Sequence, residues 1–122
     1  MDTKTSILYV DDEPINLMLF ELNFKSKYHV LTANNAKEGL EILTKNPHIP
    51  IVISDMKMPE INGVDFLRNV KENFPQCSCF ILTGFDITPE IQKALRDHII
   101  LKYLSKPFVI HEINTAIASA LN

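Results

Sequence analysis

Residues 51–55 read Ile51-Val52-Ile53-Ser54-Asp55, a short apolar run that ends in a carboxylate. Buried parallel strands have such near-continuous apolar sequences. Three other runs also end in a polar or charged side chain: Ile7-Leu8-Tyr9-Val10 before Asp11-Asp12, Phe80-Ile81-Leu82 before Thr83, and residues 99–105 before Lys106-Pro107. Open α/β sheets bind ligands beyond the carboxyl ends of their strands. The sequence therefore predicts that three acids, a hydroxyl and an amine meet at one sheet edge.

Helical patterns alternate with these runs along the chain. Pro14 suits a first helical turn, and Asn35 and Thr88 are good N-caps for two later helices. Residues 28–33 have the pattern of a second, more polar strand. Apolar side chains repeat at helical spacing in the first helix (Ile15, Met18, Leu19, Leu22 and Phe24) and in the last (Ile110, Ile113, Ile117 and Leu121).

Five strand–helix units in this order predict an α/β fold in one domain spanning residues 1–122. We expect a doubly wound, flavodoxin-like, five-stranded parallel sheet in the order 2-1-3-4-5, with five helices on its two faces. The topological switch point of that sheet lies between strands 1 and 3. Those are the strands that end in Asp11-Asp12 and in Asp55, so the topology itself predicts where the acids meet. No repeat, linker or output domain is visible in these residues.

Composition narrows the class of protein. The 122 residues are 46% apolar and carry a net charge of -3, with scattered Lys and Arg, so no basic stripe for nucleic acid is present. The chain also lacks an apolar stretch of the ~20 residues that a membrane helix needs, and it lacks a signal peptide. Cys77 and Cys79 are poorly spaced for a disulfide or a zinc site, which predicts reduced thiols and a cytoplasmic protein.

The acid cluster has a chemistry of its own. Converging carboxylates repel one another, and a hard divalent cation such as Mg²⁺ relieves that repulsion. A carboxylate can also attack phosphorus to form an aspartyl-phosphate. Asp55 is the best candidate nucleophile because it stands alone, whereas Asp11 and Asp12 form a pair suited to the metal. Lys106 would neutralise phosphoryl oxygens, and Thr83 would donate a hydrogen bond. The competing interpretation is that each acid is only a helix cap or a solvated loop residue.

At these residues the chain resembles the receiver domain of bacterial two-component response regulators, the chemotaxis receiver among them. The resemblance spans essentially the whole chain. It rests on four segments: Leu8-Tyr9-Val10-Asp11-Asp12-Glu13, Asp55-Met56-Lys57-Met58-Pro59 with Gly63, Thr83-Gly84, and Tyr103-Leu104-Ser105-Lys106-Pro107-Phe108.

The resemblance implies a role for each acid. Asp55 would be the phosphoacceptor, and Asp12, Asp55 and the backbone carbonyl of Lys57 would bind Mg²⁺. Asp11 would act on the metal mainly through water. The protein would be a phosphorylated signalling domain that catalyses only its own phosphorylation and dephosphorylation, and not an enzyme with an external substrate.

The resemblance also implies a switch. Lys106 would contact the phosphoryl group. The peptide bond between Lys106 and Pro107 would be cis. The Thr83 hydroxyl would move to the phosphoryl group and the Tyr103 ring would follow, which reshapes the surface formed by the fourth helix, fifth strand and fifth helix. Tyr103 could equally be an ordinary core aromatic. Gly84 stands where the family often has alanine. Bulky Phe85 is hypothesised to restrict the attacking water and lengthen the phosphoryl lifetime; the competing interpretation is that it simply packs on the rim of the site.

The implied partners are a sensor histidine kinase or histidine phosphotransfer protein, a downstream protein target, and a second copy in a phosphorylation-dependent homodimer. Two other functions compete with this one. A phosphatase working through an aspartyl intermediate would need a general acid near the nucleophile, commonly an Asp two residues on, where this chain has Lys57. A degenerate receiver would bind partners without phosphate, which the complete set of acids, hydroxyl and amine argues against.

Overall fold

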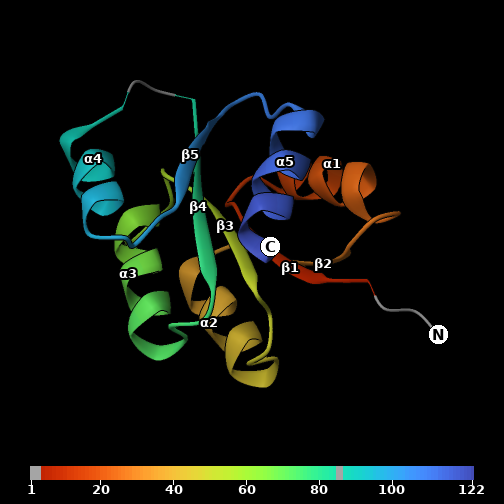
Figure 1. Cartoon of the computed structure of the whole chain (residues 1–122), viewed down its shortest axis with the longest axis horizontal. Helices are drawn as coiled ribbons and strands as arrows, with labels where there is room; N and C mark the ends of the chain where they lie inside the picture. Colours follow the sequence, from red (N-terminus) through yellow and green to blue (C-terminus); the bar gives the residue numbers. More distant parts are fainter. Residues whose placement is uncertain (1–3, 85–86) are drawn as a thin grey trace.

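The computed structural model describes residues 4–84 and 87–122. Within these residues five strands alternate with five helices, as the sequence predicted (Figure 1). In chain order they are β1 (Ser6–Val10), α1 (Pro14–Phe24), β2 (His29–Ala33), α2 (Ala36–Lys45), β3 (Ile51–Asp55), α3 (Gly63–Asn73), β4 (Ser78–Thr83), α4 (Pro89–Arg96), β5 (Lys102–Ser105) and α5 (Ile110–Leu121).

All the strand pairs are parallel, and the sheet order is β2-β1-β3-β4-β5, which confirms the predicted topology. The register explains why the polar ends meet. Val10 of β1 is level with Ser54 of β3, so the next residues along, Asp11 and Asp55, come out at the same height. Thr83 of β4 is level with Ser105 of β5, which places Lys106 just beyond the same edge.

The helices cover both faces of the sheet, as Figure 1 shows: α1 and α5 lie together on one face, and α2, α3 and α4 lie on the other. Because strand side chains alternate between faces, each face has its own core. Phe20 of α1 and Ile113 of α5 pack with Tyr9 and Ile53 in one core. The other core contains Leu8, Val10, Val52, Cys79 and Ile81 from the sheet, together with residues of the other three helices.

Two predicted N-caps are confirmed. The Asn35 side chain accepts a hydrogen bond from the Glu38 backbone N–H at 2.8 Å, and the Thr88 hydroxyl accepts one from the Ile91 N–H at 3.2 Å. Such side-chain oxygens satisfy backbone donors that the first helical turn leaves unpaired. The structure adds Asn62 as the cap of α3, because its side chain accepts a hydrogen bond from the Asp65 N–H at 2.9 Å.

The predicted apolar face of α1 is largely wrong. Ile15, Met18, Leu19 and Leu22 are between 42% and 64% exposed, whereas Phe20 and Phe24 are fully buried. The physical reason is aromatic packing: the Phe20 ring stacks on Tyr9 with centroids 4.2 Å apart, and Phe24 packs against Phe20 at 4.6 Å. The helix is apolar on two sides, so the larger rings take the core and the aliphatic row faces outward.

Two smaller expectations are also corrected. The fifth apolar run begins at Ile99, but β5 begins only at Lys102, because Ile99 and Ile100 form a turn whose N–H groups donate to the Ala94 carbonyl. In α5 the central residues are buried, but Ile110 and Leu121 at its ends are each 44% exposed. Among the described helices, none has both the length and the apolar character required to cross a bilayer.

Candidate functional site

Three carboxylates converge at the carboxyl edge of the sheet. Asp11 and Asp12 follow β1, and Asp55 is the last residue of β3. One carboxylate oxygen from each lies within 4.8 Å of the others, which confirms that the acids meet. Asp11 is fully buried and Asp55 is 7% exposed, while Asp12 is more open to solvent. A set of three oxygen donors at this separation fits a hard divalent cation such as Mg²⁺.

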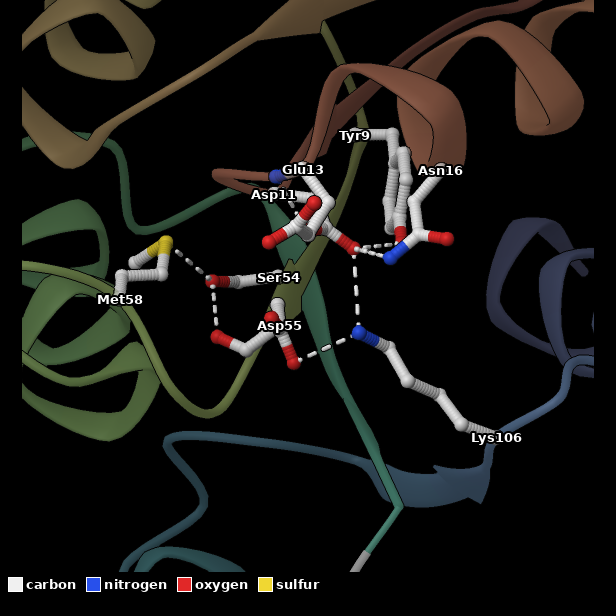
Figure 2. Close-up of polar contacts among 8 residues, drawn as sticks. All are labelled: Tyr9, Asp11, Glu13, Asn16, Ser54, Asp55, Met58 and Lys106. Carbon is white, nitrogen blue, oxygen red and sulfur yellow. Dashed lines mark hydrogen bonds and ion pairs between the residues drawn. The ribbon is translucent and has the colours of Figure 1, made fainter.

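Lys106, which directly follows β5, forms ion pairs with two of these acids. Its Nζ donates to Asp11 Oδ2 at 3.1 Å and to Asp55 Oδ1 at 3.0 Å, so one ammonium group bridges the carboxylates of two strands (Figure 2). The peptide bond between Lys106 and Pro107 is cis, which confirms the expectation from the resemblance. Lys106 and Asp11 are 95 residues apart in the sequence, and the folding of the sheet brings them into contact.

Asp11 is held by more donors than sequence analysis anticipated. Its Oδ1 accepts the backbone N–H of Glu13 at 3.0 Å. Its Oδ2 accepts the Tyr9 hydroxyl at 2.6 Å and the Asn16 amide at 3.2 Å, in addition to Lys106 (Figure 2). The signal for Tyr9 was available, because residues two apart on a strand share a face. Asn16 carried no comparable signal.

The charges of the site shift its pKa values. Burial raises the pKa of Asp55, the negative charges of Asp11 and Asp12 add to that rise, and Lys106 opposes it without cancelling it. Burial lowers the pKa of Lys106, but its bonds to Asp55 and Asp11 outweigh burial, so that pKa is raised and the ammonium stays charged. Burial and the neighbouring Asp11 raise the pKa of the Tyr9 phenol, which therefore remains a donor.

A cleft of about 460 Å³ opens beside the acids, and Asp12, Lys57 and Thr83 are among the residues that line it. Thr83 ends β4 and is 4% exposed. Tyr103 is half-buried on β5, level with Ile81 of β4, and packs against the core under α2, α3 and α4. Three of the predicted site residues, Asp12, Lys57 and Thr83, thus line one cleft. Phe85 lies outside the described residues.

The segment between β3 and α3 is tied to the acid edge. The Ser54 hydroxyl donates to the Asp55 carbonyl at 2.9 Å and points toward the Met58 sulfur, 3.8 Å away (Figure 2). The Gly63 N–H donates to the Met56 carbonyl at 2.8 Å. These bonds fold the chain back directly after Asp55.

The chain is similar in sequence to known proteins. The sequence model of the response regulator receiver domain matches residues 7–118. The chain is 32% identical to sporulation initiation phosphotransferase F of Bacillus subtilis, covering 94% of this chain and 92% of that protein. It is 28% identical to the hydrogenase transcriptional regulatory protein HoxA of Cupriavidus necator over 88% of this chain, but spans only 22% of that longer protein.

Among solved structures, a response regulator receiver domain protein from Clostridium thermocellum superposes with a TM-score of 0.86 at 35% identity, covering 97% of this chain and 94% of that one. A doubly wound sheet whose acids and lysine meet at the switch point defines a phosphoryl-accepting signalling domain. The chain belongs to the response regulator receiver domain family of two-component systems.

Proposed function

We propose that this protein accepts a phosphoryl group on Asp55 from a sensor histidine kinase or a histidine phosphotransfer protein. The observation that carries the proposal is the placement of Asp55, whose Oδ1 lies 3.0 Å from Lys106 Nζ beside the carboxylates of Asp11 and Asp12. A lone acceptor carboxylate with a fixed cation and further acids around it suits phosphoryl transfer, which depends mainly on positioning and charge neutralisation.

The proposed reaction is a direct transfer. An Asp55 carboxylate oxygen attacks phosphorus, an O–P bond forms, and the P–N bond to the donor imidazole breaks, with the electron pair leaving on the imidazole nitrogen. Lys106 then neutralises charge on the phosphoryl oxygens. Asp12, Asp55 and the backbone carbonyl of Lys57 would hold Mg²⁺, with Asp11 acting through water. When bound, Mg²⁺ supplies the positive charge that allows acids and phosphoryl oxygens to lie together.

The phosphorylated state is proposed to be communicated through Thr83 and Tyr103 to the surface of α4, β5 and α5. Thr83 supports this role because its hydroxyl-bearing side chain lies on the wall of the same cleft as Asp12. The half-buried Tyr103 lies on the neighbouring strand, and its partial burial is compatible with movement of the ring. The altered surface would engage a downstream protein or a second phosphorylated copy.

The exposed aliphatic row on α1 is proposed to be the docking face for the phosphodonor. This row consists of Ile15, Met18, Leu19 and Leu22, all at least 42% exposed. The helix begins at Pro14, two residues after Asp12, so a partner bound there would be close to the acid cluster. Contiguous exposed apolar side chains on a helix are typical of protein-binding surfaces.

Two further points complete the proposal. Residues 1–122 would act as one receiver domain, which is supported by their single sheet and by the family match over residues 7–118. The reducing cytoplasm would be the place of action, which is supported by the unpaired, buried thiols of Cys77 and Cys79. The protein would turn over only its own phosphoryl group.

The test is phosphorylation by acetyl phosphate, a small donor that needs no partner. Wild-type protein in Mg²⁺ is expected to gain the mass of a single phosphoryl group, and the gain is expected to vanish in EDTA and in Asp55→Asn. The matched control is Glu41→Gln, which removes an exposed carboxylate on α2. Asp65→Asn is less suitable, because Asp65 lies in the first turn of α3, where a negative charge stabilises the helix.

Each outcome assigns a function. Loss of the modification in Asp55→Asn but not in Glu41→Gln supports the phosphoacceptor. Continuous release of many phosphates per protein molecule would instead indicate a phosphatase. Absence of any modification in the wild type would indicate a receiver that acts without phosphate, and the proposal would then fail.

A further inference from the structure

The Oδ2 atom of Asp11 accepts three hydrogen bonds, from the Tyr9 hydroxyl at 2.6 Å, the Lys106 ammonium at 3.1 Å and the Asn16 amide at 3.2 Å. These donors differ in mobility. Tyr9 is on a central strand and Asn16 is on a helix, whereas Lys106 reaches the site on a long flexible side chain. Figure 2 shows Tyr9 and Asn16 on one side of the Asp11 carboxylate and Lys106 approaching from another.

The burial of Asp11 makes these donors consequential. The residue has no exposed surface, so water does not readily replace a lost donor. Leaving a buried acceptor without its partner is unfavourable, and more so when the acceptor is charged. In the proposed function Lys106 must leave Asp11 for the phosphoryl group. That departure is unfavourable unless other donors continue to satisfy Oδ2.

Tyr9 is built to remain in place. Its side chain is 1% exposed, and its ring stacks on Phe20 with an interplanar angle of 16°. Strand geometry directs its hydroxyl along the sheet to the carboxylate two residues further on, on the same face. The 2.6 Å separation is that of a strong hydrogen bond between a hydroxyl and a carboxylate.

We propose that Tyr9, supported by Asn16, is a positioning residue that keeps Asp11 satisfied and oriented while Lys106 transfers from the acid pair to the phosphoryl group. This inference rests on the proposed function. Tyr9 touches neither the phosphoryl group nor the donor in this scheme. It acts through Asp11, by reducing the free-energy cost of releasing Lys106.

The test compares Tyr9→Phe with Tyr28→Phe. Both variants remove one phenolic hydroxyl and keep the ring, but the Tyr28 hydroxyl donates to Asn114 at 3.1 Å, far along the chain from the acids. Two affinities are measured for each protein: that for Mg²⁺ alone, by calorimetry, and that for beryllium trifluoride in saturating Mg²⁺, by fluorine NMR. Beryllium trifluoride mimics a phosphoryl group on a carboxylate and requires no chemical step.

The expected result is a split between the two affinities. Tyr9→Phe is expected to weaken beryllium trifluoride binding about five- to tenfold, within the range for a hydrogen bond to a charged group. Its Mg²⁺ affinity is expected to stay within about twofold, because Lys106 need not leave Asp11 for the ion alone. Tyr28→Phe is expected to match the wild type in both, and Asn16→Ala to show a smaller loss in the direction of Tyr9→Phe.

A double-mutant cycle with Lys106→Met separates positioning from general stability. Without the ammonium there is no release to facilitate, so adding Tyr9→Phe is expected to cause no further loss of beryllium trifluoride affinity. An equal loss in both backgrounds would overturn the inference, as would a Tyr9→Phe protein that binds like the wild type. A wild type that neither binds beryllium trifluoride nor is phosphorylated would instead overturn the proposed function.

Discussion

Asp55 and Lys106 show how single side chains balance opposing requirements. Burial makes the Asp55 charge unfavourable and raises its pKa, yet Asp55 must be ionised to act as the proposed nucleophile for phosphorus. Lys106 partly compensates, and its own pKa is raised by the pairing. The site is therefore under electrostatic strain before a metal ion or phosphoryl group arrives, which is common where chemistry requires charges of one sign to cluster.

The direction of the Asp55 shift predicts a pH-dependent stability. Because the pKa is raised on folding, the folded protein binds this proton more tightly than the unfolded chain does. Ionised Asp55 therefore destabilises the fold. That cost is absent below the unfolded pKa, appears as the pH rises above about 3.9, and is complete once the pH exceeds the folded pKa.

We accordingly expect Asp55→Asn to stabilise the protein in EDTA at pH 7, by about 1 kcal/mol or ~4 °C in Tm. The gain should shrink as the pH is lowered toward 4. Lys106 is expected to keep Asp11 as its hydrogen-bond partner in this variant. Thermal unfolding at several pH values measures the effect, with Glu41→Gln as the control for loss of an exposed carboxylate. A gain that is constant with pH would contradict the argument.

At the scale of elements, α3 approaches β3 closely at one point. The helix begins at Gly63, where an added Cβ would overlap the backbone carbonyl oxygen of Asp55 and lie 2.8 Å from the Ile81 side chain. The backbone conformation there does not require glycine, since the φ of Gly63 is not positive. Glycine is needed at position 63 because the close packing of α3 against β3 leaves no space for a side chain.

Gly63→Ala is therefore expected to destabilise the protein by about 2 kcal/mol, because helix and strand must separate to admit a methyl group. Gly84→Ala is the matched control. Its Cβ would have Lys106 Cβ as nearest neighbour at 3.7 Å, an ordinary contact, so the change should stay within ±0.5 kcal/mol. Urea unfolding gives both values, and similar destabilisation by the two substitutions would refute the packing argument.

The element α1 shows the limit of pattern analysis. Its aliphatic residues follow helical spacing, yet they face away from the core, and Phe20 was not among the residues expected inside. Periodicity identifies an apolar stripe along a helix. It does not tell which of two apolar stripes on the same helix faces the core. The choice was made by Tyr9, whose ring stacks on Phe20, so it depended on a residue outside the helix.

At the scale of the whole molecule, the orientation of α1 brings an apolar surface and the acid cluster to neighbouring positions. The same chain segment that supplies Asp11 and Asp12 continues into the helix with the exposed row. The surface of α4, β5 and α5 includes the strand that carries Tyr103, the second residue of the proposed switch. The proposed docking face on α1 and the proposed output surface would therefore be neighbours where α1 and α5 lie together.

Met18→Glu is expected to slow phosphoryl transfer from a phosphorylated histidine phosphotransfer protein or kinase at least ~10-fold, because a charge would be buried in the docking face. Phosphorylation by acetyl phosphate should be unchanged, since the acids are untouched. Leu101→Glu is the control: Leu101 is 54% exposed and Met18 is 55%, but Leu101 lies beside β5. A screen of kinases first identifies a phosphodonor, and transfer of radiolabelled phosphate from that donor then gives the rates. Equal slowing by both variants would contradict docking on α1.

The sequence was sufficient for the sheet order, the polar residues at the carboxyl ends of the strands, two helix caps and the meeting of Asp11, Asp12 and Asp55. Those features follow from local rules, because short apolar runs form strands and parallel strands place their carboxyl ends at one edge. The outward face of α1, the close approach at Gly63 and the donors of Tyr9 and Asn16 to Asp11 needed the folded molecule. They depend on which distant side chains compete for the same space and the same oxygen atom, and no local pattern records that competition.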